Sequence, residues 1–226
     1  MLDNLLLNFE TTKLFYNEYL YKVVVKNHIG AIFRAKNLNH ARNELDRMQT
    51  QLDEEKFITR TFGIRTEPVS QQDFETSKTM FKMLSTYNQN DYKLRIEGAN
   101  TSIYSNDIDI IHNICSKVPV TELWKPNDAY KDKLDKNTIL TDYASPYNFK
   151  VTLNANKIDP AFYKWIQRNS DKIKIGKTAL ECVGKGFALG FYFFVKNEKV
   201  LQLISLMIGH NFQTVQRIVC KQDLDK

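Results

Sequence analysis

Short segments in which apolar and polar side chains alternate recur along this chain. Three of them begin with an aromatic residue and a lysine and continue with aliphatic residues two positions apart: residues 21–25, 92–96 and 149–153. A period of two residues is typical of a β-strand that buries one face, because successive side chains point to opposite sides of a sheet. We therefore expect three strands with a shared pattern of buried and exposed positions.

A similar order of elements follows each of these runs. A second β-prone segment comes next, in the third case after an interposed helix, and an asparagine then precedes apolar residues at helical spacing: Asn37, Asn106 and Asn197. Asparagine is favoured at the N-cap of a helix, so we expect each of them within a residue of a helix start. The sequence thus predicts an α+β fold of repeated strand-strand-helix units that form antiparallel sheets.

The N-terminal half contains further signals around these units. Residues 1–18 are expected to form a short helix or an arm, and residues 19–26 and 31–35 a hairpin. Residues 57–65 alternate like one strand. Ser70, followed three residues later by Asp73, resembles a capping box and predicts a helix from residue 73 to about residue 87.

Prolines and polar residues separate the two halves of the chain. Pro119, Pro126 and Pro146 flank or interrupt a stretch rich in Lys, Asp and Asn. Such composition is typical of a linker. We therefore expect an N-terminal α+β domain with two strand-strand-helix units at residues 1–118, a linker at 119–145 and a second domain at 146–226.

The last third of the chain has the clearest order of elements. Strands are expected at residues 148–154, 172–176, 186–196 and 212–221, and helices at 159–169 and 198–208. Asp159 and Pro160 are favourable residues for the start of the first helix. The order βαββαβ is that of a ferredoxin-like module, in which both helices cover one face of a four-stranded antiparallel sheet and the other face stays free.

The net charge of +6 is unevenly distributed along the chain. Residues 146–226 hold 13 Lys and Arg against 6 Asp and Glu, whereas residues 1–145 hold 19 against 20. A basic module points to a polyanionic partner, most often nucleic acid, although anionic lipid or an acidic protein has the same electrostatics. The alternative is solubility combined with the codon bias of an AT-rich genome, such as those of many bacterial viruses, because Asn, Lys, Ile and Tyr are all abundant.

One segment partly matches a nucleic-acid-binding pattern. The third strand of RNA-recognition motifs carries Lys/Arg-Gly-Phe/Tyr-Gly/Ala-Phe-Val-x-Phe/Tyr. Residues 185–188 fit its beginning, Leu189 and Gly190 depart from it, and Tyr192 fits its end. Exposed aromatic residues on such a strand stack on bases. The alternative is a central strand that is apolar on both faces and buried on both.

A helix at residues 159–169 also mixes aromatic and basic residues, which suits nucleic-acid strands, although an amphipathic helix with solvated lysines gives the same pattern. The residues that we expect to bind nucleic acid are therefore Lys150, Arg168, Lys174, Lys177, Lys185, Phe187 and Tyr192.

Signs of other chemistry are weak. Gly176 to Thr178 resembles the end of a phosphate-binding loop, but Asp171 stands where its first glycine belongs. Asp107 and Asp109 could bind a metal, yet acids are favoured at a helix N-terminus in any case. The three cysteines lack the spacing of a zinc site. We predict no cofactor, and the cysteines are expected to be reduced thiols in the cytoplasm.

The function that we expect is non-enzymatic binding of single-stranded nucleic acid or RNA by the sheet face of the basic module. A second hypothesis is an assembly or adaptor protein, viral in origin, that docks on a protein partner or on a second copy through exposed sheet surfaces. A weaker third hypothesis is a metal-dependent nuclease that uses acids of the N-terminal domain. No membrane partner is expected, because no apolar stretch is long enough to cross a bilayer.

Overall fold

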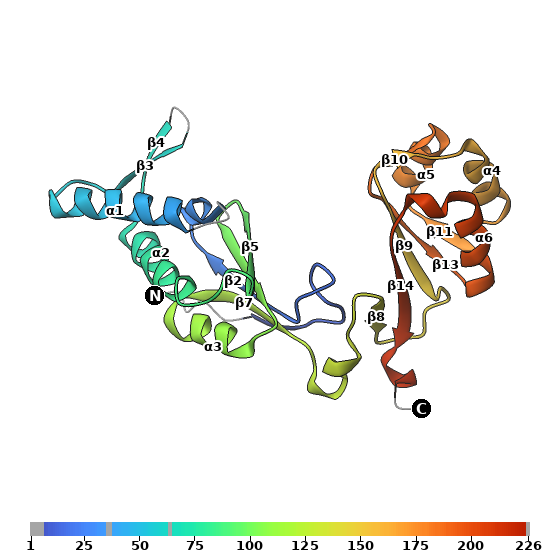
Figure 1. Ribbon diagram of the computed structural model, residues 1–226, viewed down its shortest axis with the longest axis horizontal. Coiled ribbons are helices and arrows are strands. Elements are labelled where there is room, and N and C mark those ends of the chain that lie inside the picture. Colours follow the sequence, from blue (N-terminus) through green and yellow to red (C-terminus); the bar gives the residue numbers. More distant parts are fainter. Residues whose placement is uncertain (1–6, 35–37, 63–64, 225–226) are drawn as a thin grey trace. The chain divides into compact units, whose positions relative to one another are not determined.

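The computed structural model describes residues 7–34, 38–62 and 65–224, and the chain forms two compact units. The first unit contains the chain up to Thr11 and from Glu18 to Asn127, and the second contains Thr12–Asn17 and the chain from Asp128 onward (Figure 1). The chain therefore divides within the segment that was expected to be a linker. That segment is structured and holds strand β7 (Val120–Lys125), a 3₁₀ helix (Asp128–Lys133) and strand β8 (Thr138–Thr141).

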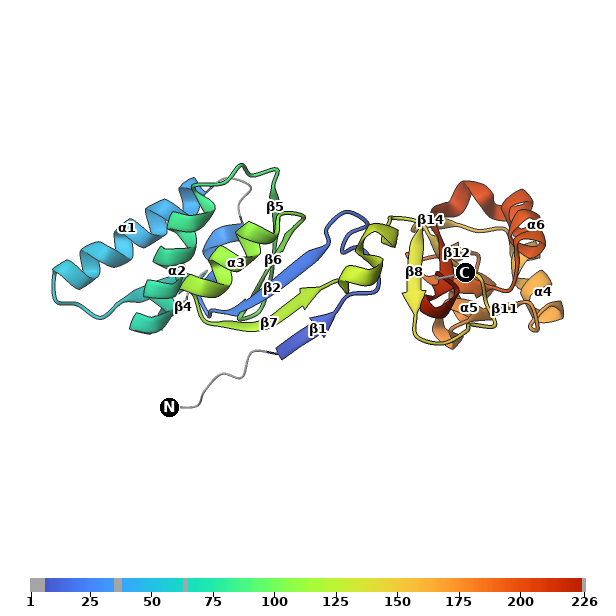
Figure 2. The same ribbon diagram turned by 90° about the horizontal axis from the view of Figure 1, so that it is seen from below.

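The first unit is built on a five-stranded mixed sheet. Its strand order is β1-β7-β2-β6-β5. The pair β1–β7 is parallel and the other three pairs are antiparallel. Figure 2 shows β1 beside β7 at the edge of this sheet. The strands other than β7 are β1 (Leu7–Glu10), β2 (Tyr21–Lys26), β5 (Tyr92–Glu97) and β6 (Asn100–Ser105), and β3 (Thr59–Phe62) and β4 (Arg65–Pro68) form a separate hairpin.

Three helices pack against the first sheet and form its core with it. Alternate positions of the strands, such as Val23, Val25 and Ile103, are fully buried in the same cluster as helix residues such as Phe74 and Ile114. The helices are α1 (Asn39–Asp53), α2 (Gln71–Leu84) and α3 (Ile108–Lys117). The alternating pattern of the sequence thus corresponds to a helix-covered face.

Side-chain caps account for where two of these helices begin. Ser70 accepts a hydrogen bond from the backbone N–H of Asp73 at 3.0 Å, as the sequence indicates. Asp107 accepts one from the N–H of Asp109 at 2.8 Å, so these two acids serve the helix N-terminus. Asn106 lies one residue earlier and accepts from the N–H of Leu20 instead of capping α3. The third asparagine of the pattern, Asn37, lies outside the described residues.

The expected strand at residues 31–35 was wrong. Gly30–Arg34 forms a 3₁₀ helix in which Ile32 and Phe33 are both buried. Consecutive buried side chains suit a helical turn more than a strand with one buried face. A Cβ at Gly30 would clash with the side chain of Thr101, so only glycine lets this turn approach β6.

Two further expectations in this unit need correction. Residues 57–65 do not form one strand, because the chain reverses between β3 and β4. The described part of residues 1–18 contains strand β1 where a helix or arm was expected. Pairing with β7 supplies the backbone hydrogen bonds that the sequence pattern of this short segment does not reveal.

The second unit is also built on a five-stranded sheet. Its strand order is β11-β13-β9-β14-β8, with the first three pairs antiparallel and the pair β14–β8 parallel. The other strands of this sheet are β9 (Phe149–Leu153), β11 (Ile173–Ile175), β13 (Tyr192–Val195) and β14 (Phe212–Cys220). Two short strands, β10 (Asn156–Lys157) and β12 (Phe187–Ala188), pair apart from it.

Helices α4 (Pro160–Arg168) and α6 (Glu198–Ile208) cover one face of this sheet (Figure 1). Asp159 and Asn197 cap them through hydrogen bonds to the N–H groups of Ala161 and Val200. The sequence predicts both helices and both caps. It misses the third helix, α5 (Lys177–Gly184), which begins after Gly176 without a side-chain cap.

The expected long strand at residues 186–196 is divided into two. Gly186 and Gly190 have φ angles of 84° and 70°, in the left-handed region that glycine adopts most easily. The chain turns at these positions, so β12 and β13 belong to different sheets. The apolar alternation across residues 187–193 therefore does not lie on one strand.

The two units share one plan of strand pairing. In each sheet, one edge strand pairs in parallel with its neighbour, and the remaining pairs are all antiparallel. The parallel edge strands are β1 in the first sheet and β8 in the second. Strand β2 of the first unit corresponds in this plan to β9 of the second, and β7 corresponds to β14. Strand β5, which begins the predicted unit at residue 92, is an edge strand and has a different place in its sheet from β2 and β9.

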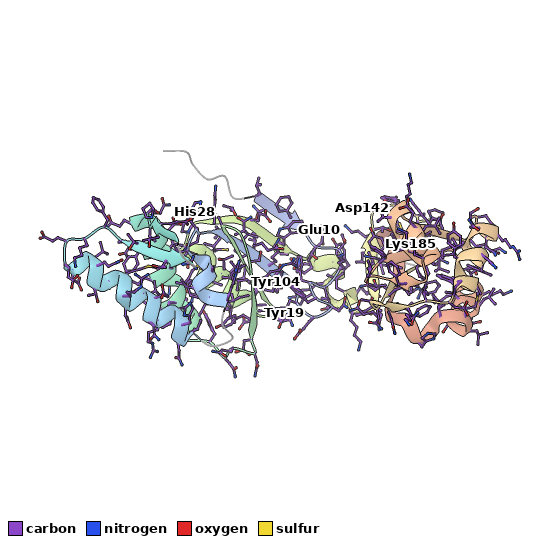
Figure 3. All side chains as sticks on the ribbon, turned by 90° about the horizontal axis from the view of Figure 1, so that it is seen from above. Glu10, Tyr19, His28, Tyr104, Asp142 and Lys185 are labelled. Carbon is purple, nitrogen blue, oxygen red and sulfur yellow. The ribbon has the colours of Figure 1, made fainter. Side chains whose placement is uncertain are left out.

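We expect the second unit to need β8 for full stability. Leu140 on β8 is 1% exposed, and Asp142 after β8, labelled in Figure 3, pairs with Lys221 after β14 at 2.8 Å. A fragment of residues 146–226 lacks both, and burial of one leucine stabilises a fold by about 1.5–3 kcal/mol. Urea unfolding followed by circular dichroism should therefore show lower stability for this fragment than for residues 128–226. Equal stability of the two fragments would contradict this role of β8.

Candidate functional site

One face of the second sheet points away from α4 and α6. Val151, Leu153, Phe193 and Val195 are buried with those helices, so the alternate strand positions lie on the opposite face. We call this opposite surface the outer face. Its strand residues include no acid. Among them are Lys150 and Thr152 on β9, Lys174 on β11, Tyr192 and Phe194 on β13, and Thr214, Gln216 and Ile218 on β14.

Aromatic rings occupy the middle of the outer face. Tyr192 is 51% exposed and meets Phe194 edge-on, with ring centroids 5.6 Å apart. Tyr147, which precedes β9, lies 6.2 Å from Phe194. Three neighbouring rings of this kind, one of them half exposed, can stack on a planar aromatic ligand.

Lys150 lies next to these rings. Its Nζ is 4.2 Å from the centroid of the Tyr192 ring, within the range of a cation–π interaction. Partial burial lowers the pKa of Lys150, and the nearby positive charge of Lys13 lowers it further. Among the described residues, no carboxylate forms an ion pair with Lys150. The outer face therefore holds a partly desolvated cation without a neutralising acid.

A depression of about 340 Å³ adjoins the rings. Its walls include Phe191, Tyr192 and Phe194, and the basic side chains at its rim are Lys174 and Lys177. Both lysines are exposed. The depression thus combines an apolar wall with positive charge at its edge.

The structure brings together four of the seven residues that the sequence analysis selected. Lys150 and Tyr192 are in contact on the outer face, and Lys174 and Lys177 line the depression beside Tyr192. Lys185 follows α5, at the end of that helix opposite Lys177 (Figure 3). A helix of eight residues is about 12 Å long, so these two lysines are well separated.

The remaining two selected residues also lie off the outer face. Phe187 is on β12, where it pairs with Lys157 in the small separate sheet. Arg168 is exposed in the last turn of α4, on the helix-covered side of the main sheet. Both placements follow from local structure that a linear motif does not encode.

Three residues that lie in this group or act on it are not among the seven that were selected. Phe194 could have been found from its spacing to Tyr192, because residues two apart on a strand share a face. Tyr147 lies just outside the strand pattern. Lys13 is separated from Lys150 by most of the chain, and no feature of the sequence links them.

The corresponding face of the first unit differs in charge and exposure. Lys22 takes the place of Lys150, but its Nζ lies 3.5 Å from a carboxylate oxygen of Glu122 and 5.3 Å from the Trp124 ring centroid. Tyr104, in the place of Phe194, is only 5% exposed and lies beside Tyr19, as Figure 3 shows. The cation of the first unit is therefore already neutralised.

Other candidate chemistry has no assembled site in the described part of the chain. Those residues contain no group of three or more His, Cys, Asp or Glu side chains placed to hold a metal ion. Cys115, Cys182 and Cys220 are free thiols, and burial raises the pKa of Cys115. No described helix is long and apolar enough to cross a membrane.

Comparison with known proteins gives no relative for this chain. No protein-family model matches it, and no curated protein or solved structure is significantly similar. The functional argument therefore depends on the geometry of the outer face.

We predict that the pKa of Lys150 lies below the ordinary value of a lysine, because burial and the charge of Lys13 both disfavour its charged form. Reductive methylation with ¹³C-formaldehyde followed by an NMR titration measures each lysine pKa. The substitution Lys13→Gln should raise the pKa of Lys150 only in part, since burial is the larger cause. Lys199→Gln on exposed α6 is the control and should leave it unchanged. An ordinary lysine pKa at Lys150 would contradict this prediction.

Proposed function

We propose that the second unit binds single-stranded nucleic acid, RNA or DNA, on its outer face. The observation that carries this proposal is Lys150, which has no neutralising acid among the described residues and lies 4.2 Å from the half-exposed Tyr192 ring. A cation beside an accessible aromatic ring meets the two needs of a nucleotide, because one group attracts the phosphate and the other stacks on the base.

The surroundings of Lys150 favour a strand over a small anion. Phe194 and Tyr147 extend the aromatic surface beyond Tyr192, and Lys174 and Lys177 add positive charge next to it. Stacking contributes about 1–3 kcal/mol per base and tolerates any sequence. Several bases with their phosphates could thus contact this face, and we expect little sequence preference.

The topology of the second unit supports the same interpretation. The order β14-β9-β13-β11, with antiparallel pairing throughout and α4 and α6 on one face, agrees with a ferredoxin-like βαββαβ module extended by β8. The order β7-β2-β6-β5 agrees with a second such module in the first unit. We propose that the chain contains two ferredoxin-like modules in tandem.

The contrast between these two modules indicates which one binds. In the first, Glu122 pairs with Lys22, and Tyr104 and Ser102 on the same face are buried. In the second, Gln216 on β14 is the residue that pairs with Lys150. The equivalent residue of the first is Trp124 on β7, which pairs with Lys22. An anion approaching Lys150 therefore meets no competing carboxylate on the strands, whereas one approaching Lys22 displaces Glu122.

The proposal is tested by fluorescence anisotropy of a labelled dodecathymidylate across a salt series. Neutralisation of one phosphate contributes about −0.7 to the slope of log affinity against log salt for a single strand. Lys150→Gln should weaken binding and reduce the steepness by about that amount. Tyr192→Leu should weaken binding by about 5- to 150-fold, from the loss of about 1–3 kcal/mol of stacking, with little change in slope.

Two control variants make this experiment specific. Lys199→Gln removes an exposed lysine from α6 on the opposite side of the sheet. Lys185→Gln removes a lysine that the partial RNA-recognition pattern selects but that is well separated from Lys177. Both should leave affinity closer to that of the unmodified protein than Lys150→Gln does. If Lys150→Gln and Tyr192→Leu bind the oligonucleotide as tightly as the two controls do, the proposal fails. It also fails if neither the unmodified protein nor any variant binds. In either case the adaptor hypothesis becomes the favoured one.

A further inference from the structure

The depression beside Tyr192 is enclosed by three elements of the second unit. Strand β11 supplies Lys174 and Ile175, the first turn of α5 supplies residues 177–179, and the segment around β13 supplies three aromatic rings. Its volume of about 340 Å³ lies near the lower limit of small-molecule sites, which is about 300 Å³. The depression therefore suits one nucleotide and is too small for a longer stretch of a strand.

Phe191 is the wall residue whose ring has the fewest other contacts. Phe193, two residues later, is fully buried in the core of this unit. Phe191 is only partly buried, and among the described residues it is not one of those that pack against this core or meet another aromatic ring. A partly exposed ring that neither stabilises the core nor stacks on a neighbour is available to a planar ligand.

The two lysines at the rim have no acid to neutralise them. Lys174 and Lys177 are exposed and form no ion pair with any described residue, and no acid lines the depression. Lys174 pairs with Phe194, which in turn pairs with Lys150, so these three residues form one row across the sheet. Adjacent strands are about 4.8 Å apart, which separates the backbones of the two lysines in this row by about 10 Å. A bound strand that follows the row meets a cation at each end.

We infer that the depression receives one unpaired base, which stacks on Phe191 while Lys174 or Lys177 holds its phosphate. This inference rests on the proposed function and deepens it by assigning a site for one base. A base in a duplex has to leave its stack and its partner before it can enter such a site, at a cost of a few kcal/mol. The depression thus gives the outer face its preference for single strands over duplexes.

Fluorescence anisotropy on the full chain with two probes tests this inference. The probes are labelled dodecathymidylate and a labelled DNA hairpin with a fully paired stem, and the unmodified protein should bind the first more tightly at the same salt concentration. Phe191→Leu keeps an apolar side chain but removes the ring. It should weaken binding of dodecathymidylate by about 5- to 150-fold, the range for one stacked base, with little change in salt slope. Its affinity for the hairpin should stay the same.

A second variant blocks the depression without removing a wall residue. Gly176 lines it, has an ordinary φ angle of −68°, and leaves open space where a Cβ would lie. Gly176→Leu therefore places a side chain in the depression without backbone strain, and it should also weaken binding of dodecathymidylate and spare the hairpin. Circular dichroism shows whether each variant is folded, and Lys199→Gln on α6 is the control.

Three outcomes separate this inference from the proposed function. The inference is overturned if folded Phe191→Leu and Gly176→Leu bind dodecathymidylate normally while Tyr192→Leu is impaired, a result that leaves the proposed function intact. It is also overturned if the unmodified protein binds the hairpin as tightly as dodecathymidylate. Normal binding by Tyr192→Leu and Lys150→Gln as well would remove the proposed function together with the inference.

Discussion

Packing of α4 and α6 against one face of the second sheet determines where the other strand side chains of that sheet point. Val151 and Phe193 are fully buried beneath these helices. Because neighbouring strand residues face opposite ways, Lys150, Tyr192 and Phe194 must lie on the outer face. Burial of apolar side chains is the dominant favourable term in folding, so the same interaction that stabilises this unit also assembles the candidate site.

The site is therefore a consequence of the fold, but its charge depends on particular residues. The two sheets share one plan of strand pairing, and each places a lysine at the same position of its first central strand. Glu122 neutralises Lys22 in the first unit, whereas no described acid does so for Lys150. Equivalent backbones thus present different surfaces. This difference, more than the excess of basic residues in the last third of the chain, distinguishes the second unit as the candidate for anion binding.

Much of the local structure could be predicted from the sequence. Apolar residues two positions apart located β2, β5 and β9, and residues with a clear capping role, such as Ser70, Asp159 and Asn197, located helix starts. These signals are local, because each arises from a side chain and backbone groups a few residues away. They also predicted a mixed α+β architecture correctly.

The errors arose where local and tertiary signals differ. Ile32 and Phe33 lie in a short apolar run that predicts a strand, yet packing against the core places them in a 3₁₀ helix. Gly186 and Gly190 resemble parts of a binding motif but turn the chain, which moves Phe187 into another sheet. Alternation along β9 and β13 places Lys150 and Tyr192 on the same face of the sheet. Lys13 could not be found in this way, since its effect on the pKa of Lys150 arises only in the folded unit.

The location of bound bases tests the central claim most directly. A single-stranded oligonucleotide that carries 5-iodouracil can be cross-linked to the full chain by ultraviolet light, and the modified residues identified by mass spectrometry. The account predicts adducts at Tyr192 or Phe194 on the outer face. Adducts confined to Tyr163 or Trp165 on α4, or to Trp124 of the first unit, would contradict it.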